Sequence, residues 1–256
     1  MSPPLKWAGG KRWLLPKLAT LWSKHSRVRL VEPFCGGLSV SLGLKPHAAL
    51  LNDVNPALIN FYQQIQKGLI LDIELENDET LYYQHRELFN LLNMGNREQK
   101  KSAELFYYLN RTGYNGLCRF NKSGGYNVPF GRYNTINYKN NFLDYQKQLN
   151  KWVFSQKDFQ ELELLDNDFI YADPPYDVQF RQYSQQGFSW DDQERLAEYL
   201  SKHKGPVVLS NQATGKVKKL YKSLGFKLHY LDAPRRISCK PNGRHEVKEV
   251  LALRGI

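Results

Sequence analysis

Four consecutive residues, Asp173, Pro174, Pro175 and Tyr176, combine an acid, two rigid turn residues and an aromatic ring. They follow the apolar stretch Phe169–Ala172, which is typical of a strand, and open α/β sheets bind ligands at such strand ends. The Asp173 carboxylate and the Pro174 carbonyl can accept both hydrogens of an amino group on a planar base, while Tyr176 stacks on its ring. Two such acceptors favour a pyramidal nitrogen with an available lone pair. The alternative is a proline-rich turn that only ends a strand.

A glycine turn, Glu32-Pro-Phe-Cys-Gly-Gly37, follows an expected strand at 27–34 and lets a ligand approach the backbone. Asp53 ends the next expected strand, at 47–53, where an acid is placed to bind ribose hydroxyls. Neither GxGxxG nor GxxxxGK[ST] is present in this stretch. The pattern therefore favours a nucleoside cofactor without phosphates over a dinucleotide, and an ordinary strand–turn–helix unit is the alternative.

Two further stretches could contact a ligand. Lys6-Trp-Ala-Gly-Gly-Lys11 is a glycine pair flanked by Trp and Lys, with a flexible terminus as the alternative. The stretch 110–133 places Arg111, Arg119 and Arg132 among tyrosines, phenylalanines and Asn-Gly or Gly-Gly turns. Arginine, asparagine and aromatic side chains can contact base edges and stack on bases. The alternative is a long hairpin loop.

The hydrophobic pattern predicts the elements that must position these residues. Asn55 is placed to cap the helix that follows it. Helical patterns between the second and third strands indicate an inserted second domain, so we expect a catalytic domain at 1–57 and 150–256 and a recognition domain at 58–149. The last two strands, joined by the basic segment 233–246, can pair as an antiparallel edge hairpin. We expect strands at 27–34, 47–53, 152–155, 168–172, 206–210, 226–231 and 247–253, and helices at 38–44, 56–67, 80–93, 97–110, 191–203 and 216–224.

The composition of the chain indicates which class of partner it binds. The 256 residues carry 36 Lys and Arg against 25 Asp and Glu, a formal charge of +11. The windows 201–256, with 13 basic and three acidic side chains, and 111–147, with six and one, hold the excess. Two basic windows favour a nucleic acid partner. Three dispersed cysteines argue against a disulfide framework or a zinc site. The chain has neither an apolar run long enough for a membrane helix nor the pattern of an export signal.

Together these motifs resemble the DNA adenine methyltransferase (Dam) family. KWAGGK, EPFCGG, the acid of the second strand, the insert and DPPY occur in the family's order along nearly the whole chain. NGLCRFN and NVPFGRY in the insert resemble the members that recognise GATC particularly closely. One departure is Leu38, where many members have a further glycine. The resemblance implies an α/β fold: a Rossmann-like methyltransferase sheet with helices on both faces and an antiparallel edge hairpin, plus an inserted, mainly helical recognition domain with a hairpin loop.

The resemblance also implies the chemistry, which is methyl transfer from S-adenosylmethionine to adenine N6 in double-stranded DNA, with Asp173, Pro174, Pro175 and Tyr176 as catalytic residues and no metal. The cofactor would contact Trp7, Ala8, Gly9, Lys11, Glu32, Phe34, Cys35, Gly36, Gly37, Asp53, Asp158, Phe159 and Asp173. DNA would contact Lys6, Arg111, Tyr114, Asn115, Leu117, Arg119, Asn127, Pro129, Arg132 and Tyr133.

Within the recognition set, the resemblance gives several residues separate roles. Arg119 would contact a guanine, and Pro129 a thymine methyl group. Tyr114 and Asn115 would fill the gap left by a flipped adenine. We expect a monomer in the cytoplasm, associated with the nucleoid, without a membrane or an obligatory protein partner. A cognate restriction enzyme is left open.

Other functions remain as alternatives. A cytosine-C5 enzyme would need a Pro-Cys nucleophile, which the sequence lacks. A cytosine-N4 enzyme would use similar chemistry, although Asp rather than Ser before Pro174 favours adenine. A protein-glutamine methyltransferase would have no use for the basic insert. A catalytically inactive DNA-binding regulator would not need the intact Asp173 and Tyr176.

Overall fold

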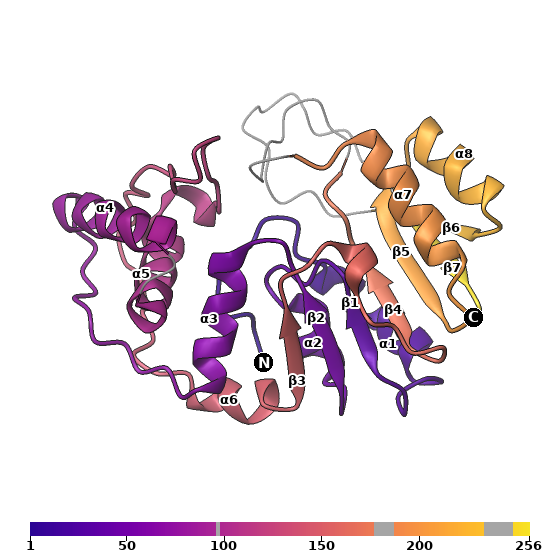
Figure 1. The fold of residues 1–256 in the computed structure, drawn as a ribbon, viewed down its shortest axis with the longest axis horizontal. Coiled ribbons are helices and arrows are strands. Elements are labelled where there is room, and N and C mark those ends of the chain that lie inside the picture. The colour runs from indigo at the N-terminus through magenta and orange to yellow at the C-terminus, as the bar shows by residue number, and fades with distance from the viewer. Residues whose placement is uncertain (96–97, 177–186, 233–247) are drawn as a thin grey trace.

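The computed structural model describes residues 1–95, 98–176, 187–232 and 248–256. One seven-stranded sheet has the order β3-β2-β1-β4-β5-β7-β6 (Figure 1). Strands β1 to β5 pair in parallel, whereas β7 runs antiparallel between β5 and β6. The strands are β1 (Leu30–Glu32), β2 (Ala49–Asn52), β3 (Trp152–Ser155), β4 (Phe169–Ala172), β5 (Val207–Gln212), β6 (Lys227–Asp232) and β7 (Lys248–Arg254).

The helices match the expected ones with two additions, the short α1 and α6, which the sequence pattern did not predict. The Asn55 side chain caps α3 by accepting from the backbone N–H groups of Ala57 and Leu58. The helices are α1 (Leu15–Trp22), α2 (Ser39–Leu44), α3 (Pro56–Gln66), α4 (Glu79–Gly95), α5 (Gln99–Thr112), α6 (Leu143–Leu149), α7 (Trp190–Ser201) and α8 (Gly215–Ser223), with 3-10 turns η1 (Arg12–Leu14), η2 (Tyr114–Gly116) and η3 (Phe159–Glu161).

Helices cover both faces of the sheet, because successive side chains of a strand point to opposite faces. Leu30 of β1 packs in a core with α1, α2, α3 and α5. Its neighbour Val31 packs in a second core with α7 and α8. The last two strands form the expected antiparallel hairpin, with β6 at the edge. The prediction of a Rossmann-like α/β sheet with helices on both faces and an antiparallel edge hairpin is therefore confirmed, while the connecting segment 233–246 lies outside the described residues.

The segment between α3 and β3 lies on one side of the sheet, with α4 and α5 beyond α3 in Figure 1. Helix α5 packs against both α3 and α4. Phe61 of α3 stacks on Tyr107 of α5, with the ring centroids 5.9 Å apart. The chain after α5 folds back through antiparallel bridges that pair Gly113 with Phe130 and Phe120 with Tyr126. The core of this segment is thus continuous with one face of the sheet, and the domain boundary at residue 58 stays a prediction.

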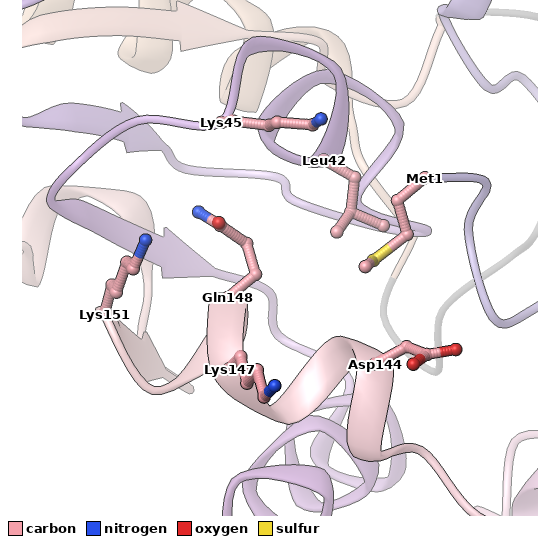
Figure 2. A pocket seen from close by; sticks show the side chains of 7 residues that line it. All are labelled: Met1, Leu42, Lys45, Asp144, Lys147, Gln148 and Lys151. Carbon is pink, nitrogen blue, oxygen red and sulfur yellow. The ribbon is translucent and has the colours of Figure 1, made fainter.

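A pocket lies near the amino-terminal ends of the strands, where Lys45 precedes β2 and Lys151 precedes β3 (Figure 2). Its lining contains none of the residues that the sequence singled out: it consists of Met1, Leu42, Lys45, Asp144, Lys147, Gln148 and Lys151. The candidate site therefore has to be sought at the opposite, carboxyl ends of the strands. No helix in the described ranges is both long and apolar enough to cross a membrane.

Candidate active site and DNA-facing surface

The centre of the site is an ion pair between Lys11, just ahead of η1, and Asp173, just after β4. Lys11 Nζ lies 2.8 Å from Asp173 Oδ2, and the Lys11 side chain is only 6% exposed. The other carboxylate oxygen, Oδ1, accepts a 2.9 Å hydrogen bond from the Ser210 hydroxyl of β5. Tyr171 and Ser210 share a further hydroxyl contact of 2.9 Å. Both oxygens of Asp173 are therefore engaged and oriented.

The DPPY turn is fixed from behind by buried polar side chains. Gln193 of α7 donates to the Pro175 carbonyl at 2.7 Å, and Asn211 of β5 donates to the Gln193 amide oxygen at 3.0 Å. The Lys11 ammonium also lies over the Tyr176 ring, 4.9 Å from its centroid. An N–H donor is thus held between a carboxylate and an aromatic face, which is the arrangement expected for a bound amino group.

Asp53 and Asn52 join the loops that follow the first three strands. Asp53 accepts backbone N–H groups from Gly36 at 3.1 Å and from Asn55 at 3.0 Å. Asn52 donates to the carbonyls of Pro33 and Lys157, both at 3.0 Å. Burial among these groups raises the pKa of Asp53 to about 6. The two side chains fix the glycine turn against the strand ends and leave a carboxylate beside it.

Trp7 covers the glycine turn directly. A Cβ atom added at Gly37 would lie 2.7 Å from Trp7 Cβ, and one at Gly36 would lie 2.6 Å from Trp7 Nε1. Gly36 has a φ of +43°, which few other residues adopt easily. Leu38, at the position of the family's further glycine, also takes a left-handed conformation, with φ at +61°. The backbone therefore keeps a glycine-like turn although a leucine occupies it.

The half-buried Ala8 and the exposed Gly9 connect Trp7 to Lys11, whose ammonium donates to the Gly9 carbonyl at 3.2 Å. Two other predicted cofactor residues, Glu32 and Cys35, are buried beside the same turn. Burial raises the pKa of Glu32 to about 8 and raises the pKa of Cys35 as well. Within the described part of the chain, Glu32 Oε1 makes no hydrogen bond.

An aromatic cluster borders the other side of the turn. The Phe34 ring centroid lies 5.9 Å from that of Phe159 and 5.5 Å from that of Phe188. Asp158 caps η3, and its carboxylate is bound by the Arg195 guanidinium through contacts of 3.0 and 2.9 Å. Phe159 therefore lies beside the turn as expected, whereas the Asp158 carboxylate already has a protein partner.

Lys6 anchors the N-terminal segment to the end of α5. The buried Asn110 side chain accepts from the Lys6 backbone N–H and donates to the Lys6 carbonyl, both at 2.8 Å. The Lys6 ammonium donates to the Arg111 carbonyl at 2.8 Å and lies 3.6 Å from the Tyr133 ring centroid. Burial, together with the nearby Arg111 charge, lowers the pKa of Lys6 to about 8. Lys6, Arg111 and Tyr133 thus form one cluster.

The other predicted DNA contacts surround this cluster on the chain 113–133. Arg119 is exposed, and two of its nitrogens donate to the side chain and backbone of Asn127 at 2.8 and 3.0 Å. This contact fixes the direction of the guanidinium. Leu117 is partly buried and packs on the core. The remaining predicted residues, Tyr114, Asn115, Pro129 and Arg132, are exposed.

Comparisons with known proteins identify the family. Residues 7–237 match the D12 class N6 adenine-specific DNA methyltransferase family, and the chain belongs to it. It is therefore an enzyme that methylates adenine in DNA, and its family and fold imply S-adenosylmethionine as methyl donor.

The chain is 37% identical to the retron Ec67 DNA adenine methylase of Escherichia coli, over 100% of this chain and 92% of that protein. It is 35% identical to a DNA adenine methylase of Vibrio cholerae, over 97% and 94% of the two chains. It is 31% identical to the type II methyltransferase M1.LlaDCHI of Lactococcus lactis, over 98% and 94%.

Five residues next to the site were missed by the sequence analysis. Glu249 of β7 and Gln193 of α7 lie beside Lys11 and Pro175, and Asn110 holds Lys6. Phe188 joins the aromatic cluster, and Val54, 53% exposed, follows Asp53. None of the five carried a local signal in the sequence, because single apolar side chains are common at protein surfaces.

A methyl group added at Gly37 tests the contact between this residue and Trp7. In Gly37→Ala the new Cβ would displace Trp7, so we expect affinity for S-adenosylmethionine to fall roughly tenfold or more. Isothermal titration calorimetry measures this affinity. Gly215→Ala is the matched control, because a Cβ there meets no atom within 4 Å. Unchanged affinity in Gly37→Ala would contradict the role of this contact.

Glu32 makes stability depend on pH. Its native pKa of about 8 lies above the ordinary 4.5, so between these values the unfolded chain releases a proton that the native protein retains. Native stability is therefore lost as pH rises through this window, by ~1.4 kcal/mol per pH unit at most. Glu32→Gln cannot ionise, so its melting temperature should exceed that of the wild type at pH near 8 and match it near pH 5. Equal pH dependence of wild type and variant would refute this, and the exposed Glu194→Gln is the control.

Proposed function

We propose that this enzyme methylates the adenine of GATC in double-stranded DNA, after flipping that base into the pocket of Asp173, Pro174 and Tyr176. The observation that carries the proposal is the Lys11 ammonium, an N–H donor that bonds Asp173 and lies over the Tyr176 ring. An adenine amino group needs the same two partners. An adenine inside the duplex cannot reach them, so the base must leave the stack.

The residues at the glycine turn fit S-adenosylmethionine. Gly36 and Gly37 leave no room for side chains beneath Trp7, and Asp53 offers a carboxylate next to that turn. The buried Glu32 Oε1, without a hydrogen-bond donor among the described residues, can accept from an ammonium group. Phe34 and Phe159 offer apolar surface for an adenine ring. The bound cofactor supplies a methyl group activated by a sulfonium charge.

The protein's own contribution is orientation and exclusion of water. Asp173 and the Pro174 carbonyl accept the two amino hydrogens, which makes the nitrogen lone pair available and directs it toward the donor. Ser210 and Gln193 hold these acceptors in place through Asp173 and Pro175. Fixed positioning of two reactants can supply a large part of the rate acceleration. The proton lost from the nitrogen passes to Asp173 or to water.

We assign recognition of the DNA target sequence to residues 113–133. The Arg119 guanidinium, held by Asn127, retains free N–H groups for a guanine edge. Tyr114 and Asn115 are exposed, and Asn115 adopts a left-handed φ of +53° in the turn η2. These features support the assignment of GATC. The cytosine-N4 alternative and the inactive regulator are not favoured, because the family is one of N6-adenine enzymes.

Expression in a host without DNA methylation tests the activity and the site. Sequencing that detects modified bases should find N6-methyladenine in GATC, and Asp173→Asn should abolish it while leaving the fold intact. Methylation in a different sequence would exclude GATC specificity. An active Asp173→Asn variant would contradict the role of that carboxylate.

Arg119→Ala tests base recognition. We expect discrimination against a substituted guanine in the site to fall by ~1–3 kcal/mol, measured as the ratio of kcat/KM for cognate and substituted duplexes. Lys122→Ala removes one charge from the same exposed loop and should leave this ratio unchanged. If both variants discriminate as the wild type does, Arg119 does not contact the guanine.

A further inference from the structure

Glu249 of β7 is a buried carboxylate beside the site that the mechanism above does not use. Its side chain is 6% exposed, and Oε1 lies 3.8 Å from Lys11 Nζ. Its register partners are the uncharged Gln212 of β5 and Leu231 of β6. A lone buried carboxylate is costly unless a cation or a hydrogen-bond donor compensates it. The burial of this carboxylate next to Lys11 therefore needs an explanation.

Two carboxylates share one ammonium group here. Lys11 Nζ bonds Asp173 at 2.8 Å and lies 3.8 Å from Glu249. Among the described residues, Asp173 raises the pKa of Glu249 and the Tyr176 hydroxyl lowers it, while Glu249 in turn raises the pKa of Tyr171. Lys11 is thus placed between two anions and bonded to only one of them.

The entry of a target base would change this balance. Asp173 already accepts from Lys11 on one oxygen and from Ser210 on the other. A target amino group competes with Lys11 for Asp173 and for the space over the Tyr176 ring. Moving a buried ammonium away from the anion that it bonds is costly when no other anion replaces it. A second anion within reach removes most of that cost.

We propose that Glu249 is the second counter-ion of Lys11 and takes over its ammonium when the target amino group binds Asp173. The inference rests on the proposed function. Glu249 acts through Lys11 and is therefore a positioning residue. A shift of the ammonium by roughly 1 Å would shorten the Glu249 contact to ordinary hydrogen-bond distance.

The exchange depends on pH in a defined direction. Burial raises the pKa of Glu249 to about 7, and Lys11 opposes that rise. Only the ionised carboxylate can pair with the ammonium, so base entry should weaken as pH falls below this value. Glu249→Gln should behave at every pH like the wild type at low pH, because neither carries the charge.

Single-turnover methylation of a GATC duplex tests the proposal, with enzyme in excess and saturating cofactor, from about pH 5.5 to 8.5. The wild-type rate should fall about tenfold per pH unit below pH 7, and the Glu249→Gln rate should be nearly flat and ~10-fold or more lower at pH 8. Saturating cofactor keeps the titration of Asp53 out of the profile.

Asp232→Asn on β6 is the matched control, since it removes an exposed carboxylate from the same hairpin without approaching Lys11. It should retain the wild-type profile. A Glu249→Gln enzyme with the wild-type rate and pH dependence overturns the proposal. If that variant does not fold, a wild-type rate that stays constant between about pH 6 and 8 overturns it equally. Failure of the proposed function is distinguishable, because wild-type enzyme would then leave GATC unmethylated at pH 8.

Discussion

Lys11 and Asp173 hold opposite charges 2.8 Å apart, and their side chains are 6% and 20% exposed. The Lys11 ammonium must be positioned by the rest of the fold, because it is too buried to relax into solvent. Trp7 on the glycine turn and Asn110 on the Lys6 backbone fix the segment that carries Lys11. Ser210 fixes the partner carboxylate. Much of the architecture around the sheet's carboxyl edge can be understood as the support that this one pair requires.

The segment that carries Lys11 also connects the surface proposed for DNA with the proposed catalytic site. Residues 6–11 run from the surface proposed for DNA, where Lys6 lies on Tyr133, to the proposed site of methyl transfer, where Lys11 meets Asp173. Between these ends Trp7 covers the turn proposed for the cofactor. The three proposed tasks therefore share a single structural element, and Asn110 connects it to α5.

Local patterns in the sequence predicted the sheet, its antiparallel hairpin and the cap at Asn55, because strand periodicity and capping depend on neighbouring residues. DPPY and the glycine turn were recognisable for the same reason. The short α1, of eight residues, was not predicted from the sequence pattern. Glu249, Gln193 and Asn110 were missed because each acquires its role only from a contact distant in the sequence. The predicted pairing of Asp158 with a cofactor did not anticipate Arg195, which comes from a helix further along the chain.

The distance along the chain between Lys11 and its two anions has a consequence for how activity arises during synthesis. Lys11 leaves the ribosome early, whereas Asp173 lies 162 residues later and Glu249 comes with the strand inserted last between β5 and β6. Contacts of such high sequence separation form late and slowly. Nascent or prematurely terminated chains would lack a complete site even if their first strands had folded. The larger basic window, 201–256, is also made last, so an unfinished chain would lack both the complete site and most of the charge that favours binding to DNA.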